Sequence, residues 1–218
     1  MSSGTSRAAE PAGGAGPRGR IDKRQAILRA AFTVFARRGY EQACVREIAD
    51  EAGVAKPTVY NHLNDKETLF RHTVIAAADT VAADNLAAVE RLRDPGGDLG
   101  AVLTDVGLRL LRVCCGERAT ALRRLSSAQA ASMPDLFETV IERTGLAVRD
   151  ALADRFARLS LAGRLRECPP DQAAEQFVAL LTGPAETRSR FGTRRVPVAE
   201  QRAVATAAAD TFLRAYGS

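Results

Sequence analysis

The chain has 218 residues, of which 46% are hydrophobic and 26% are charged, and its formal net charge at pH 7 is +5. This balance is typical of a globular protein and excludes wholesale disorder. Aromatic residues make up only 5% of the chain and tryptophan is absent, whereas alanine, the strongest helix former, is abundant. Because strands favour aromatic and β-branched residues, the composition predicts an all-α fold.

The apolar runs, cysteines and histidines exclude several classes of protein. No apolar run reaches the roughly 18 residues that cross a membrane, and residues 1–20 lack the hydrophobic region of a secretory signal. The cysteines show no metal-ligand spacing, and the two histidines, His62 and His72, have no nearby ligand residues to complete a site. We therefore expect a cytoplasmic protein with reduced thiols and without a metal, a cofactor or a membrane partner.

Charge is distributed unevenly along the chain. Residues 1–63 carry ten lysines and arginines against six acidic residues, whereas residues 64–218 carry twenty-one against twenty. A basic first third beside a near-neutral remainder is typical of a small anion-binding domain attached to a second domain.

The predicted elements begin after an irregular tail. Residues 1–20 are rich in Gly, Pro, Ala and Arg without periodicity, so we expect them to be disordered. From residue 21, apolar residues recur about every four positions, which predicts a helix that ends at Gly39. Further helices are predicted over residues 45–52, 56–63, 65–93, 99–115, 118–131, 134–162, 173–181 and 198–216. No segment alternates in the manner of a strand, so we expect about nine helices and no sheet.

The segment from Cys44 to Leu63 is the most informative part of the chain. Gly53 separates two short helices there and supplies the left-handed backbone of a tight turn, while Ala49 lets the helices approach closely. This pattern predicts a helix-turn-helix, whose second helix can enter the major groove of DNA. That helix carries donor-rich side chains and no carboxylate, which suits phosphates and base edges.

Residues 24–74 resemble the DNA-binding region of the TetR family of bacterial repressors. The family's spacings are matched by A-A-x-x-x-F-A-x-x-G-Y, V-R-E-I-A, A-G-V-x-K-x-T-V-Y and D-K-E-x-L-F. The residues to which the resemblance gives a DNA-binding role are Arg46, Lys56, Pro57, Thr58, Tyr60, Asn61, His62 and Lys66. Lys56, Thr58 and Asn61 hold positions that contact bases or adjacent phosphates. Tyr60 and Lys66, with His62, hold positions that contact the DNA backbone.

Two positions depart from the family pattern. Cys44 replaces the usual serine or threonine that caps the second helix and touches phosphate, which places that contact in doubt. Leu63 stands where an aromatic residue is common, and we expect this change only to repack the core.

The rest of the chain resembles, more loosely, the C-terminal domain of the AefR-like branch, in LRRLSSAQAASMPDLF and AEQFVALLTG. The resemblance implies a DNA-binding domain at residues 21–64 and an effector-binding and dimerisation domain at residues 65–218. It also implies a repressor that an unknown small molecule releases from a palindromic operator. Gln129 and Thr144 are candidates to line the effector cavity, although a satisfied core group explains each of them equally well.

The last two predicted helices are expected to form a homodimer, because a single helix-turn-helix makes too few base contacts for useful specificity. Their apolar stripes contain Phe177, Leu181, Val204, Ala208, Phe212 and Ala215. The same stripes also fit helices that only close their own bundle. Pro184 is expected to break or kink the first of the two helices. The helix over residues 65–93 is long enough to touch both domains and could couple them.

An enzyme is not expected, because the sequence shows no phosphate-binding glycine loop and no nucleophile elbow. The alternative to a DNA-binding regulator is a helical protein that senses a small molecule or thiol redox state without acting through DNA. The neighbouring Cys114 and Cys115 would be its thiols, although two small buried hydrophobic residues explain this pair as well.

Overall fold

The computed structural model describes residues 17–218, with side chains from residue 21 onward. Its α-helices are α1 (Pro17–Gln42), α2 (Val45–Ala52), α3 (Lys56–His62), α4 (Lys66–Val89), α5 (Leu99–Cys114), α6 (Glu117–Ala128), α7 (Pro134–Ile141), α8 (Ala147–Leu161), α9 (Pro170–Arg188) and α10 (Val198–Tyr216). A π-helical turn, Glu142–Leu146, joins α7 to α8, and a 3-10 turn, Glu90–Leu92, follows α4. With α7 and α8 counted as one helix, the described chain has the nine helices expected, and the all-α prediction is confirmed.

Local signals set most of the helix boundaries. α2 and α10 have the predicted limits, and Gly39, with φ 77° and ψ 172°, interrupts α1 near its end. Asp65 caps α4: its carboxylate accepts a hydrogen bond from the backbone N–H of Thr68 at 2.7 Å and another from the Thr68 hydroxyl. These hydrogen bonds hold the pKa of Asp65 below its usual value.

Two helices differ from the prediction by the most residues. α1 begins at Pro17, so residues 17–20 of the expected tail are helical, because proline suits a first turn where no N–H is needed. Residues 1–16 of that tail lie outside the described residues. α9 begins at Pro170 for the same reason and continues through Pro184 to Arg188. Pro184 was expected to break or kink this helix; the break is wrong, since α9 continues past Pro184 and the burial of Leu181 and Ala185 holds the surrounding turn against the core.

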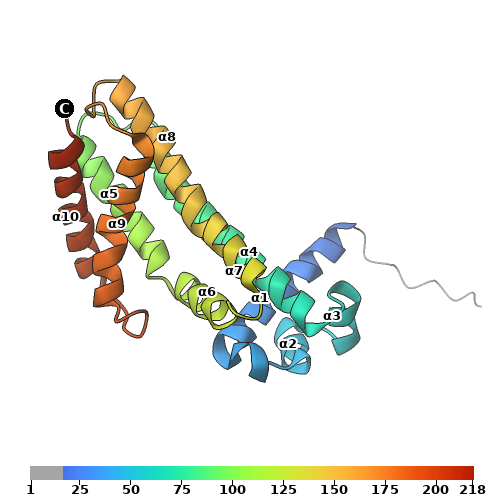
Figure 1. Ribbon diagram of the computed structural model, residues 1–218. Coiled ribbons are helices and arrows are strands. Elements are labelled where there is room, and N and C mark those ends of the chain that lie inside the picture. Colours follow the sequence, from blue (N-terminus) through green and yellow to red (C-terminus); the bar gives the residue numbers. More distant parts are fainter. Residues whose placement is uncertain (1–16) are drawn as a thin grey trace, which may run out of the picture.

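Figure 1 shows how α4 links two ends of the molecule. The helices α1, α2 and α3 lie at one end, and α5, α9 and α10 lie at the other. The continuous α7–α8 helix runs alongside α4, and α6 packs against both α1 and α4. None of the described helices has both the length and the hydropathy needed to cross a membrane.

The first hydrophobic core lies around the rings of Phe35, Tyr40 and Phe70. The Phe35 and Phe70 rings meet edge to face at 5.0 Å, and Tyr40 lies 4.8 Å from Phe70. This core contains buried residues from α1 to α4, and it also takes in Leu122 and Leu125 of α6 and residues of α7. Packing therefore continues across the boundary expected at residue 64, because α6 packs against α1 and α4, and α7 packs against α4.

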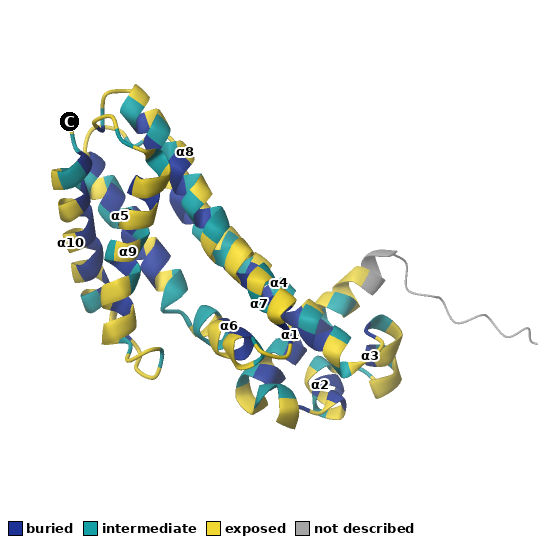
Figure 2. Cartoon of the chain, in the orientation of Figure 1, coloured by how far each residue is buried: buried dark blue, intermediate teal, exposed yellow. Residues whose placement is uncertain are grey.

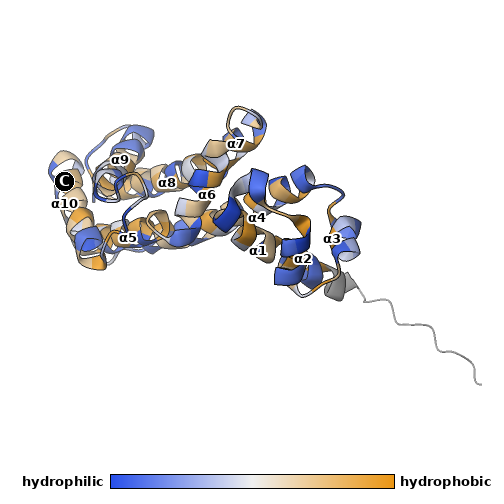
Figure 3. Ribbon diagram, turned by 90° about the horizontal axis from the view of Figure 1, so that it is seen from below, coloured by the Kyte–Doolittle hydropathy of each residue, from blue (hydrophilic) through white to orange (hydrophobic). Residues whose placement is uncertain are grey.

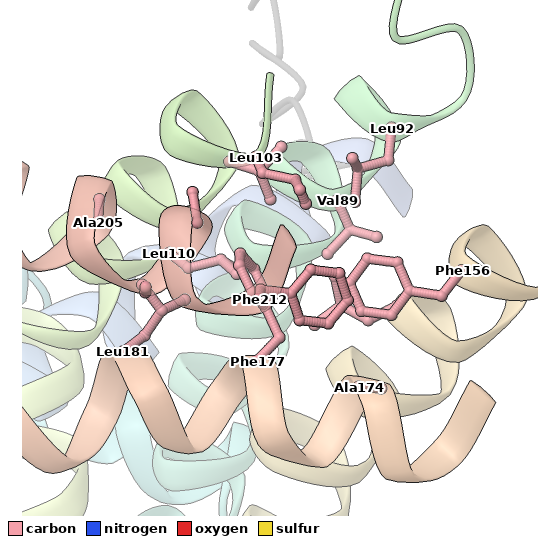
Figure 4. Packing of buried hydrophobic residues seen from close by; sticks show 14 of the residues in the cluster. Val89, Leu92, Leu103, Leu110, Phe156, Ala174, Phe177, Leu181, Ala205 and Phe212 are labelled. Atoms are coloured by element: carbon pink, nitrogen blue, oxygen red, sulfur yellow. The ribbon is translucent and has the colours of Figure 1, made fainter. Parts of the chain in front are cut away.

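The second core fills the other end of the molecule. Figure 4 shows Phe156, Phe177 and Phe212 together, with ring centroids 4.7 to 5.8 Å apart. The stripe residues expected at the dimer contact are mostly here: Phe177, Leu181, Val204, Ala208 and Phe212 are all buried within the chain. These five residues therefore pack within their own bundle and are not exposed for contact with a second copy.

Candidate nucleic-acid interface and ligand cavity

The turn between α2 and α3 has the geometry that a helix-turn-helix needs. Gly53 ends α2 in the left-handed conformation, with φ 65° and ψ 34°. Its N–H bonds to the carbonyl of Asp50, and the N–H of Val54 bonds to the carbonyl of Ala49 at 3.0 Å. These bonds satisfy carbonyls that the end of α2 would otherwise leave open, and they direct the chain into α3.

We expect Gly53→Ala to lower the free energy of unfolding by about 1–2 kcal/mol, because a side chain makes the left-handed backbone costly. A Cβ at this position would meet no atom within 4 Å, so the effect isolates backbone strain from packing. Gly53→Asn should cost less, since asparagine tolerates this conformation. Urea unfolding of the three proteins measures the difference. Equal midpoints for Gly53→Ala and the wild type would show that the turn does not depend on glycine.

A buried face holds the two helices in place. Ile48 and Val59 are fully buried and Leu63 is 2% exposed, so both helices contribute to the first core. Leu63 is thus a core residue at the position where the family commonly has an aromatic residue. The carboxylate of Glu47 accepts hydrogen bonds from Arg37 at 2.7 Å and from Arg38 at 3.4 Å. The bond from Arg37 is the main reason that the pKa of Glu47 lies below its usual value. These contacts tie α2 to the end of α1.

The expected DNA-contacting residues lie mainly on α2 and α3, whose ribbons are largely in the hydrophilic colour in Figure 3. The exposed members of the set are Arg46, Lys56, Pro57, Tyr60 and Asn61, and the half-buried members are Thr58, His62 and Lys66. The ammonium group of Lys56 lies over the ring of Tyr60, 5.7 Å from its centroid. The face of α3 thus offers a cation and several neutral donors, and residues 54–64 contain no carboxylate.

Lys66 makes contacts within the chain, and the side chain of Cys44 makes none that would cap α2. Lys66 donates a hydrogen bond to the carbonyl of Glu41 at 2.8 Å and lies 4.9 Å from the centre of the Tyr40 ring. Lys66 is the first residue of α4, and its ammonium group stabilises the carbonyl end of α1. Cys44 is the N-cap residue of α2 and makes no capping hydrogen bond through its side chain, in line with the doubt raised by the sequence.

A cavity of about 400 Å³ is lined by residues of α4, α5, α6, α7, α8 and α9. Its lining is largely apolar. Its polar side chains are Asn85, Arg123, Ser126, Ser127, Thr144 and Thr182. Thr144 lines the cavity, and its hydroxyl donates to the carbonyl of Val140 at 2.7 Å, so both alternatives given for this residue stay open. Gln129 does not line it: Gln129 ends α6, and its side chain accepts a hydrogen bond from Ser132 at 2.8 Å. Asn85 also lines the cavity, but it was not predicted from the sequence. Its position four residues after Val81 places both on one face of α4, which could have indicated it.

The neighbouring thiols lie at one edge of this cavity. Cys114 lines it, and all four cysteines of the chain are free. A hydrogen bond from Cys115 and the nearby guanidinium of Arg123 lower the pKa of the Cys114 thiol, against the opposing effect of burial. Within residues 17–218, no three His, Cys, Asp or Glu side chains are grouped so that they could hold a metal ion.

These features together define a class of protein, the helix-turn-helix regulators that join DNA-binding helices to a helical bundle containing a cavity. The family comparisons agree with this class. Residues 27–73 match the profile of the tetR family of bacterial regulatory proteins, and residues 101–218 match that of the AefR-like transcriptional repressor C-terminal domain. The chain belongs to the TetR family, and its C-terminal half is of the AefR-like type.

Individual relatives support the same assignment. A putative TetR-family transcriptional regulator from Mesorhizobium loti is 31% identical, with a TM-score of 0.84 over 91% of this chain and 98% of that chain. The repressor Rv1474c of Mycobacterium tuberculosis is 27% identical over 73% of this chain and 78% of its own length. The repressor AcnR of Corynebacterium efficiens is 37% identical, but the match covers only 34% of this chain and 43% of AcnR.

Proposed function

We propose that the protein represses transcription from the cytoplasm by binding a palindromic DNA site as a homodimer, and that a small molecule in the cavity releases it. The observation that carries this proposal is the exposed, carboxylate-free face of α3 on a buried scaffold. Such a helix suits the major groove, where donors contact phosphates and base edges. The protein acts by binding, without catalysing a reaction.

The proposed dimer forms through the outward faces of α9 and α10. Small exposed residues on these two helices allow close approach of a second copy: Ala179, Gly183, Ala199, Ala203 and Ala207. Figure 2 shows the exposed face of α10 on the outside of the molecule. Two-fold pairing would present two α3 helices to half-sites about one turn of DNA apart.

The proposed coupling between cavity and DNA runs through α6 and α7 as well as α4. Leu122 of α6 and Val140 of α7 line the cavity and also belong to the first core. Arg124 of α6 donates a hydrogen bond to the carbonyl of Ala36 in α1. A ligand that displaces α6 therefore acts directly on the helices that carry the helix-turn-helix. Release requires only that the ligand bind the DNA-incompetent arrangement more tightly.

The test of DNA binding is a comparison of Asn61→Ala with Asn64→Ala, an exposed asparagine just beyond α3. A site selected by the wild type from random duplexes serves as the operator. Asn61→Ala should lose about 1–3 kcal/mol of discrimination at the base pair that Asn61 contacts, because a side-chain amide pairs specifically with a base edge. Asn64→Ala should discriminate as the wild type does.

Fluorescence anisotropy with the operator and with single-base variants measures these differences. Full wild-type discrimination in Asn61→Ala would refute the base contact. Failure of the wild type to select any duplex would favour the alternative, a sensor of small molecules or thiol state that does not act through DNA.

A further inference from the structure

A second hollow, of about 740 Å³, lies beside the cavity and shares two of its lining residues. This groove lies between the junction of α5 and α6 and the segment that connects α9 to α10. Cys114 and Arg123 line both the groove and the cavity. The two hollows are therefore adjacent at Cys114 and Arg123.

The groove is strongly basic. Its charged side chains are Arg112, Arg123, Arg124, Arg194 and Arg195, against Glu117 and Glu186. Arg124 donates to the carbonyl of Ala36, and Arg194 pairs with Glu200 at 2.6 Å. Among residues 17–218, Arg112 and Arg195 have neither an ion pair nor a side-chain hydrogen bond. Two unpaired guanidinium groups in one hollow suit a phosphate or a carboxylate, which arginine binds through paired hydrogen bonds.

A buried polar group in the same groove has no partner. Gln201 is 7% exposed, and its Nε2 donates to the carbonyl of Val196 at 2.8 Å. Its Oε1 is buried and accepts no hydrogen bond from the described residues. Buried acceptors are normally satisfied, so Gln201 Oε1 is a polar atom beside the groove for which the described residues supply no donor. The first turn of α6 also borders the groove, and its N-cap residue, Gly116, provides no side-chain cap.

We infer that the effector is an amphipathic anion whose apolar part fills the cavity and whose phosphate or carboxylate group lies in the groove beside Arg112 and Arg195. The inference rests on the proposed function for its regulatory meaning, but the site itself is defined by the two hollows and their shared lining residues. The apolar lining alone would accept an uncharged ligand equally well, so the groove is what selects the charge.

Isothermal titration of the full-length protein without DNA tests the ligand class. The probes are decyl phosphate, decanoate, decanol and inorganic phosphate, with the alkyl probes kept below their micelle concentrations. We expect decyl phosphate or decanoate to bind at least about tenfold more tightly than decanol and inorganic phosphate, because only the amphipathic anions occupy both hollows. Equal binding of decanol and both alkyl anions would overturn the inference, as would tighter binding of inorganic phosphate, which would place a simple anion in the groove.

Variants then locate the charge. The double variant Arg112→Gln/Arg195→Gln should lose the advantage of the alkyl anions over decanol while binding decanol as before. Arg149→Gln, on α8 and outside both hollows, is the matched control and should bind every probe as the wild type does. If the double variant does not fold, it is replaced by the single variant Arg195→Gln, in the exposed segment between α9 and α10. This variant should reduce the affinity ratio of the alkyl anions to decanol at least threefold. An unchanged advantage in a folded variant contradicts the assignment.

Operator binding is measured separately, so the two proposals can fail independently. A protein that binds its operator but shows no preference for the alkyl anions retains the proposed function and refutes the ligand class. A protein that prefers the alkyl anions but binds no duplex retains the ligand class and refutes the regulatory role.

Discussion

Replacing Phe70 with alanine is expected to lower the free energy of unfolding by about 3–5 kcal/mol, the usual cost of deleting a buried ring. Phe70 is fully buried near the start of α4, where its ring touches both Phe35 and Tyr40 of α1. Deleting it leaves a cavity between α1 and α4, whose buried residues share the first core with those of α2 and α3. Operator affinity should therefore fall as well, because α3 is no longer held in one position.

Phe191 provides the matched control, since it carries the same side chain but is 86% exposed. Phe191→Ala should change the free energy of unfolding by no more than about 0.5 kcal/mol, as is usual for surface substitutions. Urea unfolding followed by circular dichroism compares the two variants. A loss below 1 kcal/mol in Phe70→Ala would show that the first core can close around the gap and that the ring does not organise the DNA-binding helices.

Replacing Ala207 with glutamate is expected to convert the proposed dimer into monomers and to weaken operator binding by about 100-fold or more. Ala207 lies on the exposed face of α10. In a two-fold contact, each copy would place a new carboxylate against the other copy, and an unpaired buried charge costs about 3–5 kcal/mol. Since about 1.4 kcal/mol corresponds to a tenfold change, the loss of pairing removes most of the affinity that two half-sites provide together.

Ala87→Glu makes the same change on the exposed face of α4, away from α9 and α10, and should leave both assembly and operator binding unaltered. Light scattering at micromolar concentration reports the assembly, and anisotropy reports the affinity. If Ala207→Glu remains a dimer with wild-type operator affinity, the contact lies on another surface. If the wild type is itself monomeric, alone and on DNA, the proposed dimer is wrong.

The sequence by itself determined the helices and the helix-turn-helix. The stop at Gly53, the cap at Asp65 and the limits of α2 and α10 all depend on residues within one or two turns of the chain. Capping, backbone permissiveness and apolar spacing act over that range, so the sequence displays them directly. For the same reason the donor-rich face of α3 could be located in advance, because Val59 and Leu63 mark its buried side.

Only the tertiary structure decided which apolar stripes meet. α6 and α7 complete the core of the DNA-binding helices, and Arg124 reaches the carbonyl of Ala36, 88 positions earlier in the chain. An apolar stripe shows that a helix face is buried but does not show which other element it contacts. The stripes of α9 and α10 that contain Phe177 and Phe212 could therefore equally have formed a dimer contact. Their common packing with Phe156 assigned them to their own bundle. The groove beside the cavity has the same origin, because Arg112, Arg195 and Gln201 come together only when distant helices pack.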